Sequence, residues 1–411
     1  MATVNQLSTD TANAGDGVMG FIRANAHAFA RTSDFAEFFK ALGSTEFDRL
    51  QSLWVAVMQI QSGQEERGAH AVEALLRTLP DQEDGAGSVA MRSFAEALLG
   101  RLRRIDGSGG NLYLGGRPPG AQLRAFELLR LRTPLIPFAY AAGNRALLSL
   151  LSEPTDVTIM DVGIGRGGQI IALLRNPAAA RLFKSLHVIG IEPDSSSATG
   201  AGALETAEHN VLAAARDAGI SVSFAGIAKR AEELTGADLA AAKPRGFTVA
   251  NGAFALHHVP PSADEPSGRD RVLRVLRESG AQAIILVEPD SDHYCDDLPA
   301  RLLHSYRHYR SLAHSLHSML TTADAELVWQ EFFGPEVRNV ITHDGPGRTE
   351  RHEETGRWLE RLTAAGWKPD RLLDLVPQSA APQGFTLKSA GGAFCLAYRG
   401  VSAIGVLRAR C

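Results

Sequence analysis

Apolar runs of strand length alternate with helical periodicity between residues 158 and 287. The runs are rich in β-branched and aliphatic residues, and amphipathic helices are predicted over residues 207–218 and 269–278. This alternation predicts an α/β fold whose parallel sheet has helices on both faces. Ligands of such sheets bind beyond the carboxyl ends of the strands. The five predicted strands are residues 158–162, 186–191, 221–225, 247–251 and 283–287.

The regions on either side of this alternation have other patterns. Residues 17–104 have the spacing of several amphipathic helices. A turn-rich segment over residues 106–120 is either a plain linker or a loop at the mouth of the site. Later segments are predicted as a helix-rich stretch (122–151), a long helix (298–320), a sixth strand (338–342) and a closing antiparallel hairpin (392–400 with 401–408).

Length and pattern together predict two structural parts that share one core. The first is a helical region over residues 1–120. The second is a Rossmann-like core over residues 121–411, with a helical insertion at about residues 293–325.

Composition excludes several classes of function. The chain of 411 residues has a net charge of −4 and a pI near 6.4, and no basic run marks a nucleic-acid surface. The three cysteines are scattered, which fits reduced thiols rather than a disulfide framework or a metal cluster. Because neither a secretion signal nor a long apolar run occurs, we expect a cytoplasmic protein without a membrane contact.

The first strand ends in an acid and four glycines, which predicts a turn that binds a nucleotide. Asp161 lies two residues before Gly163, and Glu192 follows the second strand. The glycine spacing also fits a dinucleotide, but an acid at the strand tip suits the cationic S-adenosyl-L-methionine better than a pyrophosphate. A loop-capping role for Asp161 and a surface position for Glu192 remain alternatives. The predicted cofactor-binding residues are Asp161, Gly163, Gly165, Gly167, Gln169, Glu192, Ile227, Ala228 and Asn251.

Acids and imidazoles at the tips of the fourth and fifth strands suggest chemistry. Methyl transfer from a sulfonium needs alignment, exclusion of water and, for a protonated acceptor, a base. We expect Glu288 to bind the acceptor, a cationic amine or guanidinium, and His257 or His293 to act as a base or as an orienting hydrogen-bond donor. Capping by Asp290 and a structural role for Glu288 or His257 are the alternatives. The predicted substrate-binding residues are Asn144, Phe254, Asp290, Tyr306 and Tyr309, and no metal site is predicted because the His304/His308 pair lacks the usual glutamate between them.

With these residues in view, the chain resembles the GRAS family. Residues 159–169 (IMDVGIGRGGQ) are similar to the family's I-I-D-F-D-I-G-Q-G-G-Q, and residues 287–293 (VEPDSDH) to V-E-Q-D-S-N-H. Three further segments are also similar: residues 143–148 to A-N-Q-A-I-L, residues 255–259 to the L-H-H-L element, and residues 351–358 to E-R-H-E-x-x-x-x-W. Gly163 replaces an acid of the plant pattern, which restores the methyltransferase form D-x-G-x-G.

The resemblance implies a helical cap over a Rossmann-like core of the class I methyltransferase type, as in the family's bacterial members. We therefore expect a methyltransferase that uses S-adenosyl-L-methionine to N-methylate a small-molecule acceptor. The alternative is a non-catalytic regulatory or ligand-binding protein, as the plant members imply, and a nicotinamide enzyme ranks third. The N-terminal helices also offer a surface for a homodimer.

Overall fold

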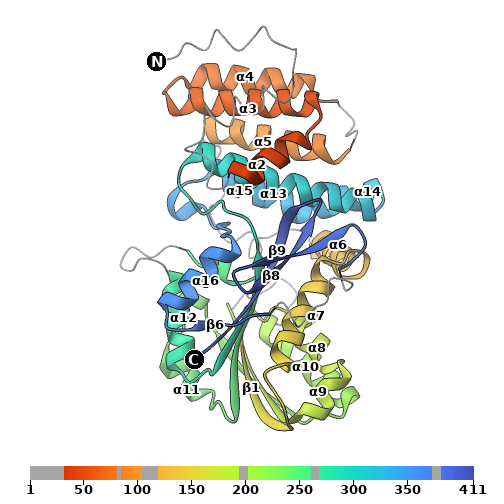
Figure 1. The fold of residues 1–411 in the computed structure, drawn as a ribbon, viewed down its shortest axis with the longest axis vertical. Helices are drawn as coiled ribbons and strands as arrows, with labels where there is room; N and C mark the ends of the chain where they lie inside the picture. The colour runs from red at the N-terminus through yellow and green to blue at the C-terminus, as the bar shows by residue number, and fades with distance from the viewer. Residues whose placement is uncertain (1–31, 81–84, 104–118, 194–201, 261–267, 373–380) are drawn as a thin grey trace.

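The computed structural model describes residues 32–80, 85–103, 119–193, 202–260, 268–372 and 381–411 (Figure 1). A twisted central sheet with helices on both sides forms the lower part of the view, and a layer of helices lies across its upper end. The predicted mixed α/β fold with a central sheet is thus confirmed. The boundary at residue 120 stays a prediction, and the linker over residues 106–120 lies mostly outside the described residues.

The central sheet has the strand order β3-β2-β1-β4-β5-β9-β8-β7, and β6 pairs with β9. Neighbours among the first five strands run parallel, whereas β9 is antiparallel to β5, and β8 and β7 continue as antiparallel neighbours. The strands are β1 (Thr155–Val162), β2 (Phe183–Glu192), β3 (Val222–Ala228), β4 (Phe247–Ala253), β5 (Ala283–Pro289), β6 (Lys368–Pro369), β7 (Phe385–Ala390), β8 (Ala393–Tyr398) and β9 (Val401–Arg410).

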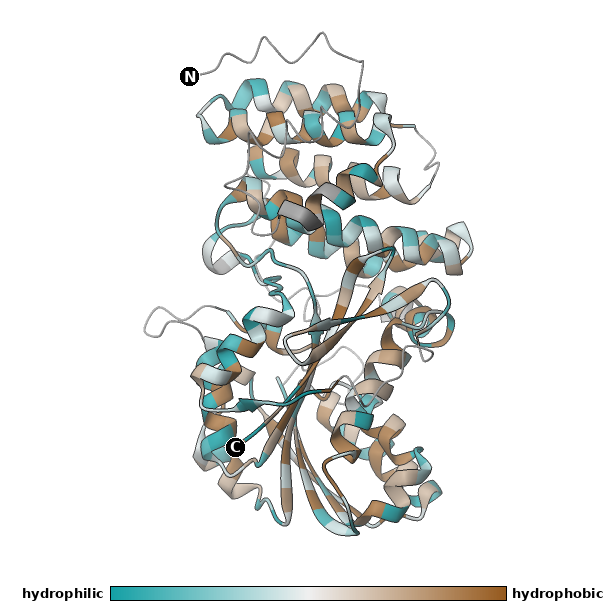
Figure 2. Cartoon of the chain, in the orientation of Figure 1, coloured by the Kyte–Doolittle hydropathy of each residue, from teal (hydrophilic) through white to brown (hydrophobic). Residues whose placement is uncertain are grey.

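Consecutive residues of the central strands face two different apolar cores. Ile159 of β1 belongs to one core cluster and Met160 to the other, as expected when side chains alternate across a sheet. Figure 2 shows the hydrophobic colour concentrated in the strands, with polar colour on the outer faces of the helices. Helices around the sheet are α6 (Pro119–Arg132), α7 (Leu135–Leu148), α8 (Gly168–Leu174), α9 (Pro177–Leu182), α10 (Ala203–Ala218), α11 (Gly236–Ala241), α12 (Gly268–Glu278) and α16 (Thr355–Ala364), with short turns η3 (Ala231–Glu233) and η4 (Leu256–His258).

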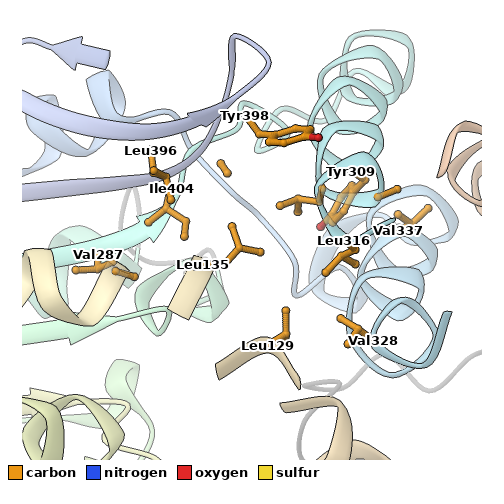
Figure 3. Close-up of a cluster of buried hydrophobic side chains, with 14 of the residues drawn as sticks. Leu129, Leu135, Val287, Tyr309, Leu316, Val328, Val337, Leu396, Tyr398 and Ile404 are labelled. Atoms are coloured by element: carbon orange, nitrogen blue, oxygen red, sulfur yellow. The ribbon is translucent and has the colours of Figure 1, made fainter. Parts of the chain in front are cut away.

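The layer of helices combines segments that are distant in sequence. Long helix α13 packs on α5, and Arg310 of α13 forms an ion pair with Glu46 of α3. Apolar side chains from the sheet, α13 and neighbouring helices meet in one cluster between the layer and the sheet (Figure 3). The layer contains α2 (Thr32–Lys40), α3 (Ser44–Gln61), α4 (Glu65–Thr78), α5 (Ala86–Leu102), α13 (Leu298–Met319), α14 (Thr322–Val328), η5 (Trp329–Phe333), α15 (Gly334–Thr342) and η6 (Gly345–Gly347).

Several predicted elements differ from the structure. The sixth strand predicted at residues 338–342 is wrong, because these residues form the end of helix α15. The helix-rich stretch over residues 122–151 is divided into α6 and α7, with Pro134 between them. The closing hairpin is confirmed as β8 and β9, but the pattern missed β7. Within the described ranges, no helix has both the length and the apolar character needed to cross a bilayer.

Candidate functional site

The glycine turn between β1 and α8 is hydrogen-bonded to the end of β2. Gly163, Gly165 and Gly167 have φ values of 72°, 53° and 79°, a region that favours glycine. The N–H of Gly163 donates to the Ile191 carbonyl at 2.8 Å. The N–H of Gly165 donates to Glu192 Oε2 at 3.0 Å. One oxygen of Glu192 therefore holds the turn, so only the other oxygen is free to bind a ribose.

Packing on the two sides of this turn is unequal. A Cβ added at Gly163 would lie 2.4 Å from the Cβ of Ala255, whereas one added at Gly165 would find no heavy atom within 4 Å. The tip of β3 adds an exposed Ala228 and a half-buried Ile227 to the region that follows the parallel strands. The space that a side chain would enter is therefore open at Gly165 and filled by Ala255 at Gly163, although Gly163 itself is exposed.

Four buried polar side chains form a chain of hydrogen bonds beneath the turn. The amide of Asn251 on β4 donates to Asp161 Oδ1 at 2.7 Å and to Gln169 Oε1 at 2.9 Å. Asn144 of α7 then donates to the Gln169 carbonyl at 3.0 Å. All four residues are at most 5% exposed. In this structure they bind one another, so Asn144 lies too deep to contact an acceptor from solvent.

Burial also changes the charge of Asp161. Burial raises the pKa of this carboxyl to about 7, against the opposing hydrogen bond from Asn251, and the nearby Glu192 raises it further. In this conformation Asp161 Oδ1 accepts from Asn251. Its role in binding the cationic end of S-adenosyl-L-methionine stays a prediction, because a bound cation would itself favour the charged carboxylate.

A second polar region lies at the tips of β4 and β5. Glu288 accepts from the Leu256 N–H at 2.9 Å, and its other oxygen lies 2.6 Å from His257 Nδ1. Glu288 is 1% exposed and His257 is 4% exposed. Burial raises the pKa of Glu288 to about 7, although the Leu256 N–H opposes this. Burial lowers the pKa of His257 well below its usual value, and the neighbouring His258 adds to the effect.

Two residues that were not predicted from the sequence complete this region. Glu350 and His352, in the segment before α16, lie beside His257. The ring of His293 lies beside the ring of His352, with centroids 4.3 Å apart and a tilt of 44°, and His293 is fully buried. The available signal for His352 was the segment 351–358, which resembles the GRAS family's E-R-H-E-x-x-x-x-W.

A network of charges fixes this region in place. Arg269 of α12 donates to Glu353 at 2.7 Å and to the carbonyls of His257 and Arg351. Arg361 of α16 binds the same Glu353 through two nitrogens. Arg269 and Glu353 are 0% and 1% exposed. Buried arginine and glutamate are thus paired, as buried charges require.

The remaining predicted substrate residues are dispersed. Asp290 lines a cavity of about 440 Å³ beside α13 and the β7–β8 turn, but its Oδ1 accepts from the Thr355 N–H at 2.7 Å at the start of α16. Phe254 is half-buried and has a φ of 56°, which is unusual for a residue with a side chain. It stays a candidate contact residue near the turn.

The structure contradicts the predicted role of the two tyrosines of α13. Tyr306 and Tyr309 are both 0% exposed. Their hydroxyls donate to Glu46 of α3 and Glu336 of α15, respectively. Both phenols therefore belong to the packing of the helical layer and do not reach an acceptor.

Comparison with known proteins gives a consistent set of relatives. A family model described as the GRAS domain family matches residues 50–397. Scarecrow-like protein 5 of Arabidopsis thaliana is 27% identical over 79% of this chain and 57% of its own length. Scarecrow-like transcription factor PAT1 of the same plant is 26% identical over 75% of this chain and 64% of its own length. The chain thus spans less than two thirds of either relative.

A solved structure supports the fold. The crystal structure of SCL7 in Oryza sativa superposes with a TM-score of 0.73 at 20% identity, and the match covers 88% of this chain and 99% of that one. At this level of identity the likeness concerns the fold alone.

These relatives correct the predicted function. They are named as Scarecrow-like proteins and one as a transcription factor, so the prediction of a methyltransferase, and of an enzyme at all, is wrong. The predicted partners, a small-molecule acceptor and no nucleic acid, are wrong for the same reason. The relatives are plant proteins, which leaves the predicted bacterial branch unsupported. Over most of its length, the chain belongs to the GRAS domain family.

Proposed function

We propose that this chain is a non-catalytic regulatory protein that influences transcription through the proteins it binds. One geometric observation carries the proposal: the three side chains best suited to catalysis, Glu288, His257 and His293, are at most 4% exposed. A general base must come within hydrogen-bond reach of its substrate. Side chains enclosed to this degree serve to position the segments around them. The name of the PAT1 relative supports the same class of function.

A transcription assay tests the proposal. The full chain is fused to an unrelated DNA-binding domain and placed upstream of a reporter gene. We expect reporter output to change, and the change to be lost in Leu407→Asp, which puts a charge into the centre of β9. Glu208→Gln, at an exposed position of α10, is the matched control and should behave as the unaltered chain. Unchanged reporter output, together with transfer of a labelled methyl group to a small amine, contradicts the proposal.

A second candidate is ligand binding without chemistry. The observation that favours it is the open space beside Gly165 in the glycine turn, which adjoins Glu192 and Ala228. S-adenosyl-L-methionine is the proposed ligand, with its ribose on the remaining oxygen of Glu192 and its adenine near Ile227. The parallel order β3-β2-β1-β4-β5 with an antiparallel β9 supports our inference of a Rossmann-like core of the class I type.

Calorimetry with S-adenosyl-L-methionine and its demethylated product tests ligand binding. Glu192→Gln should weaken binding about 10- to 100-fold, the equivalent of about 1.5–3 kcal/mol for hydrogen bonds to a charged group. Glu205→Gln, exposed on α10, should leave affinity unchanged. Absence of binding heat with the folded protein rejects this candidate and leaves the regulatory proposal untouched.

A further inference from the structure

His257, Glu350 and His352 bring three metal-binding atoms into one buried cluster. His257 belongs to the turn η4 after β4, while Glu350 and His352 lie in the segment before α16. Glu350 Oε2 is 3.8 Å from His257 Nε2 and 3.5 Å from His352 Nε2. One ligand atom from each of the three residues lies within 4.8 Å of the other two. Two imidazoles and a carboxylate therefore converge on a single point.

Hydrogen bonds within the protein do not account for this convergence. Glu350 is 0% exposed and His352 is 2% exposed. Neither oxygen of Glu350 and neither ring nitrogen of His352 makes a hydrogen bond of normal geometry. Buried polar groups are nearly always hydrogen-bonded, because an unsatisfied one destabilises the fold. Of these atoms, His352 Nε2 and the Glu350 oxygens lie on the same side, and one ion could be their common partner.

The spacing suits a small divalent ion. Zinc binds histidine nitrogens and carboxylate oxygens at about 2.0–2.2 Å in a tetrahedral arrangement, which places neighbouring ligand atoms roughly 3.4 Å apart. The separations of 3.5 and 3.8 Å are close to this value. Nitrogen and oxygen ligands together favour zinc or a similar transition metal over calcium and magnesium, which prefer oxygen alone.

The surroundings of His257 fit the outer shell of a metal site. Its Nδ1 lies 2.6 Å from Glu288, which is itself held by the N–H groups of Leu256 and Ala255. A metal-binding histidine usually donates its second ring nitrogen to a carboxylate, which fixes the ring and keeps the lone pair on the other nitrogen. Glu288 is therefore placed to orient His257 with Nε2 toward Glu350.

We propose that His257, Glu350 and His352 bind one divalent transition-metal ion, of which zinc fits best. The fourth position faces His258, whose Nδ1 is 3.2 Å from Glu350 and whose side chain is 17% exposed. The ion ties η4, at the tip of β4, to the segment that leads into α16. With His258 as the fourth ligand, the set has the four protein ligands of a structural zinc site, so it extends the regulatory proposal without any need for catalysis.

The alternative occupant of this point is a proton. A positively charged imidazole, His258 being the nearest, can neutralise Glu350 without a metal. The two arrangements differ in one measurable property, because only the first takes up an ion in a one-to-one ratio. If a proton occupies the site, added Co²⁺ stays unbound and keeps the visible spectrum of the free ion.

The experiment uses the full chain, freed of any affinity tag and dialysed against a chelator. We expect calorimetry with Zn²⁺ to give one site per chain, and Co²⁺ to give the intense visible bands of a tetrahedral site. Zn²⁺ should raise the Tm of the unaltered chain, and Mg²⁺ should not. Failure of the unaltered chain to bind either ion in a one-to-one ratio overturns the proposal, whatever the variants do.

Variants then assign the ligands. Glu350→Gln and His352→Gln should weaken Zn²⁺ binding at least about 100-fold, and Glu288→Gln about 10- to 100-fold, as for groups that orient a ligand. His209→Gln on the exposed face of α10 is the control for adventitious binding to histidine. Circular dichroism checks that each variant is folded. Unaltered affinity in folded Glu350→Gln and His352→Gln assigns the ion elsewhere and overturns the proposal.

Discussion

The glycine turn and the His257 cluster both lie where the parallel strands end, but their polar groups are matched very differently. Under the turn, Asp161, Asn251 and Gln169 bind one another through amide hydrogen bonds. In the cluster, Glu350 and His352 come close to other polar groups without normal hydrogen bonds. Residue types at strand tips therefore identify polar regions. The hydrogen bonds inside each region decide whether its polar groups remain available to bind a ligand.

Removal of Arg269 should have the largest effect on stability, because this residue holds the frame of the cluster. Arg269→Met leaves Glu353 and two buried carbonyls without this partner, and we expect the free energy of unfolding to fall by about 3–5 kcal/mol. Urea denaturation measures the loss. Arg357→Met removes an exposed pair with Glu360 and should change stability by less than about 0.5 kcal/mol. Equal losses in the two variants show that the buried frame is not what fixes this region.

The buried Asp161 below the turn should make the free energy of unfolding depend on pH. The pKa of Asp161 is about 7 when folded and 3.8 when unfolded, so the folded chain binds the extra proton between these values. The free energy of unfolding therefore falls as pH rises from about 4 to about 7, by at most about 4 kcal/mol, and this contribution then levels off. Glu192, whose pKa is also raised by burial, adds a slope of the same sign.

Asp161→Asn should remove the share of the slope that comes from Asp161, whereas the share of Glu288, whose pKa burial also raises to about 7, should persist. Urea denaturation of the unaltered chain and the variant at pH 5 and pH 8 measures the difference. Tyr140, which faces Asp161, does not interfere because burial raises its pKa to about 12. The same pH dependence in both proteins places the titrating group elsewhere.

A smaller effect should separate the filled space at Gly163 from the open space at Gly165. Gly163→Ala and Gly165→Ala both force alanine into a left-handed conformation, at a cost of roughly 1–2 kcal/mol. Only the first also overlaps Ala255, which should add about 1–3 kcal/mol. Thermal unfolding compares the variants, and Ala255→Gly in the Gly163→Ala background should restore the added part. Equal losses without rescue mean that the packing on the two sides does not differ.

The sequence was sufficient for most of the sheet. Strands β1, β2, β4 and β5 contain apolar runs with β-branched residues, each followed by a polar residue, and such runs indicate buried strands. The stretch 338–342 is also rich in β-branched residues and was wrongly interpreted as a strand. Val337, Val340 and Ile341 are all buried at helical spacing within α15, so periodicity was the more reliable signal there.

The candidate sites were less predictable, because their properties depend on contacts between distant segments. The positions of Asp161 and Glu192 at the ends of predicted strands identified both residues. Their hydrogen bonds with Asn251 and the Gly165 N–H, respectively, depend on side-chain directions that the sequence does not give. The meeting of His257 with Glu350 and His352 depends on how the segment before α16 returns to the tip of β4. No local pattern encodes such a return.

The placement of β9 in the sheet has a consequence for how the chain folds during synthesis. This strand inserts between β5 and β8, so the outer edge of β5 stays unpaired until residues 401–410 have left the ribosome. An exposed apolar edge can pair with the same edge of another chain. The interval between synthesis of β5 and of β9 is therefore the period when newly made chains are most open to aggregation and to capture by chaperones.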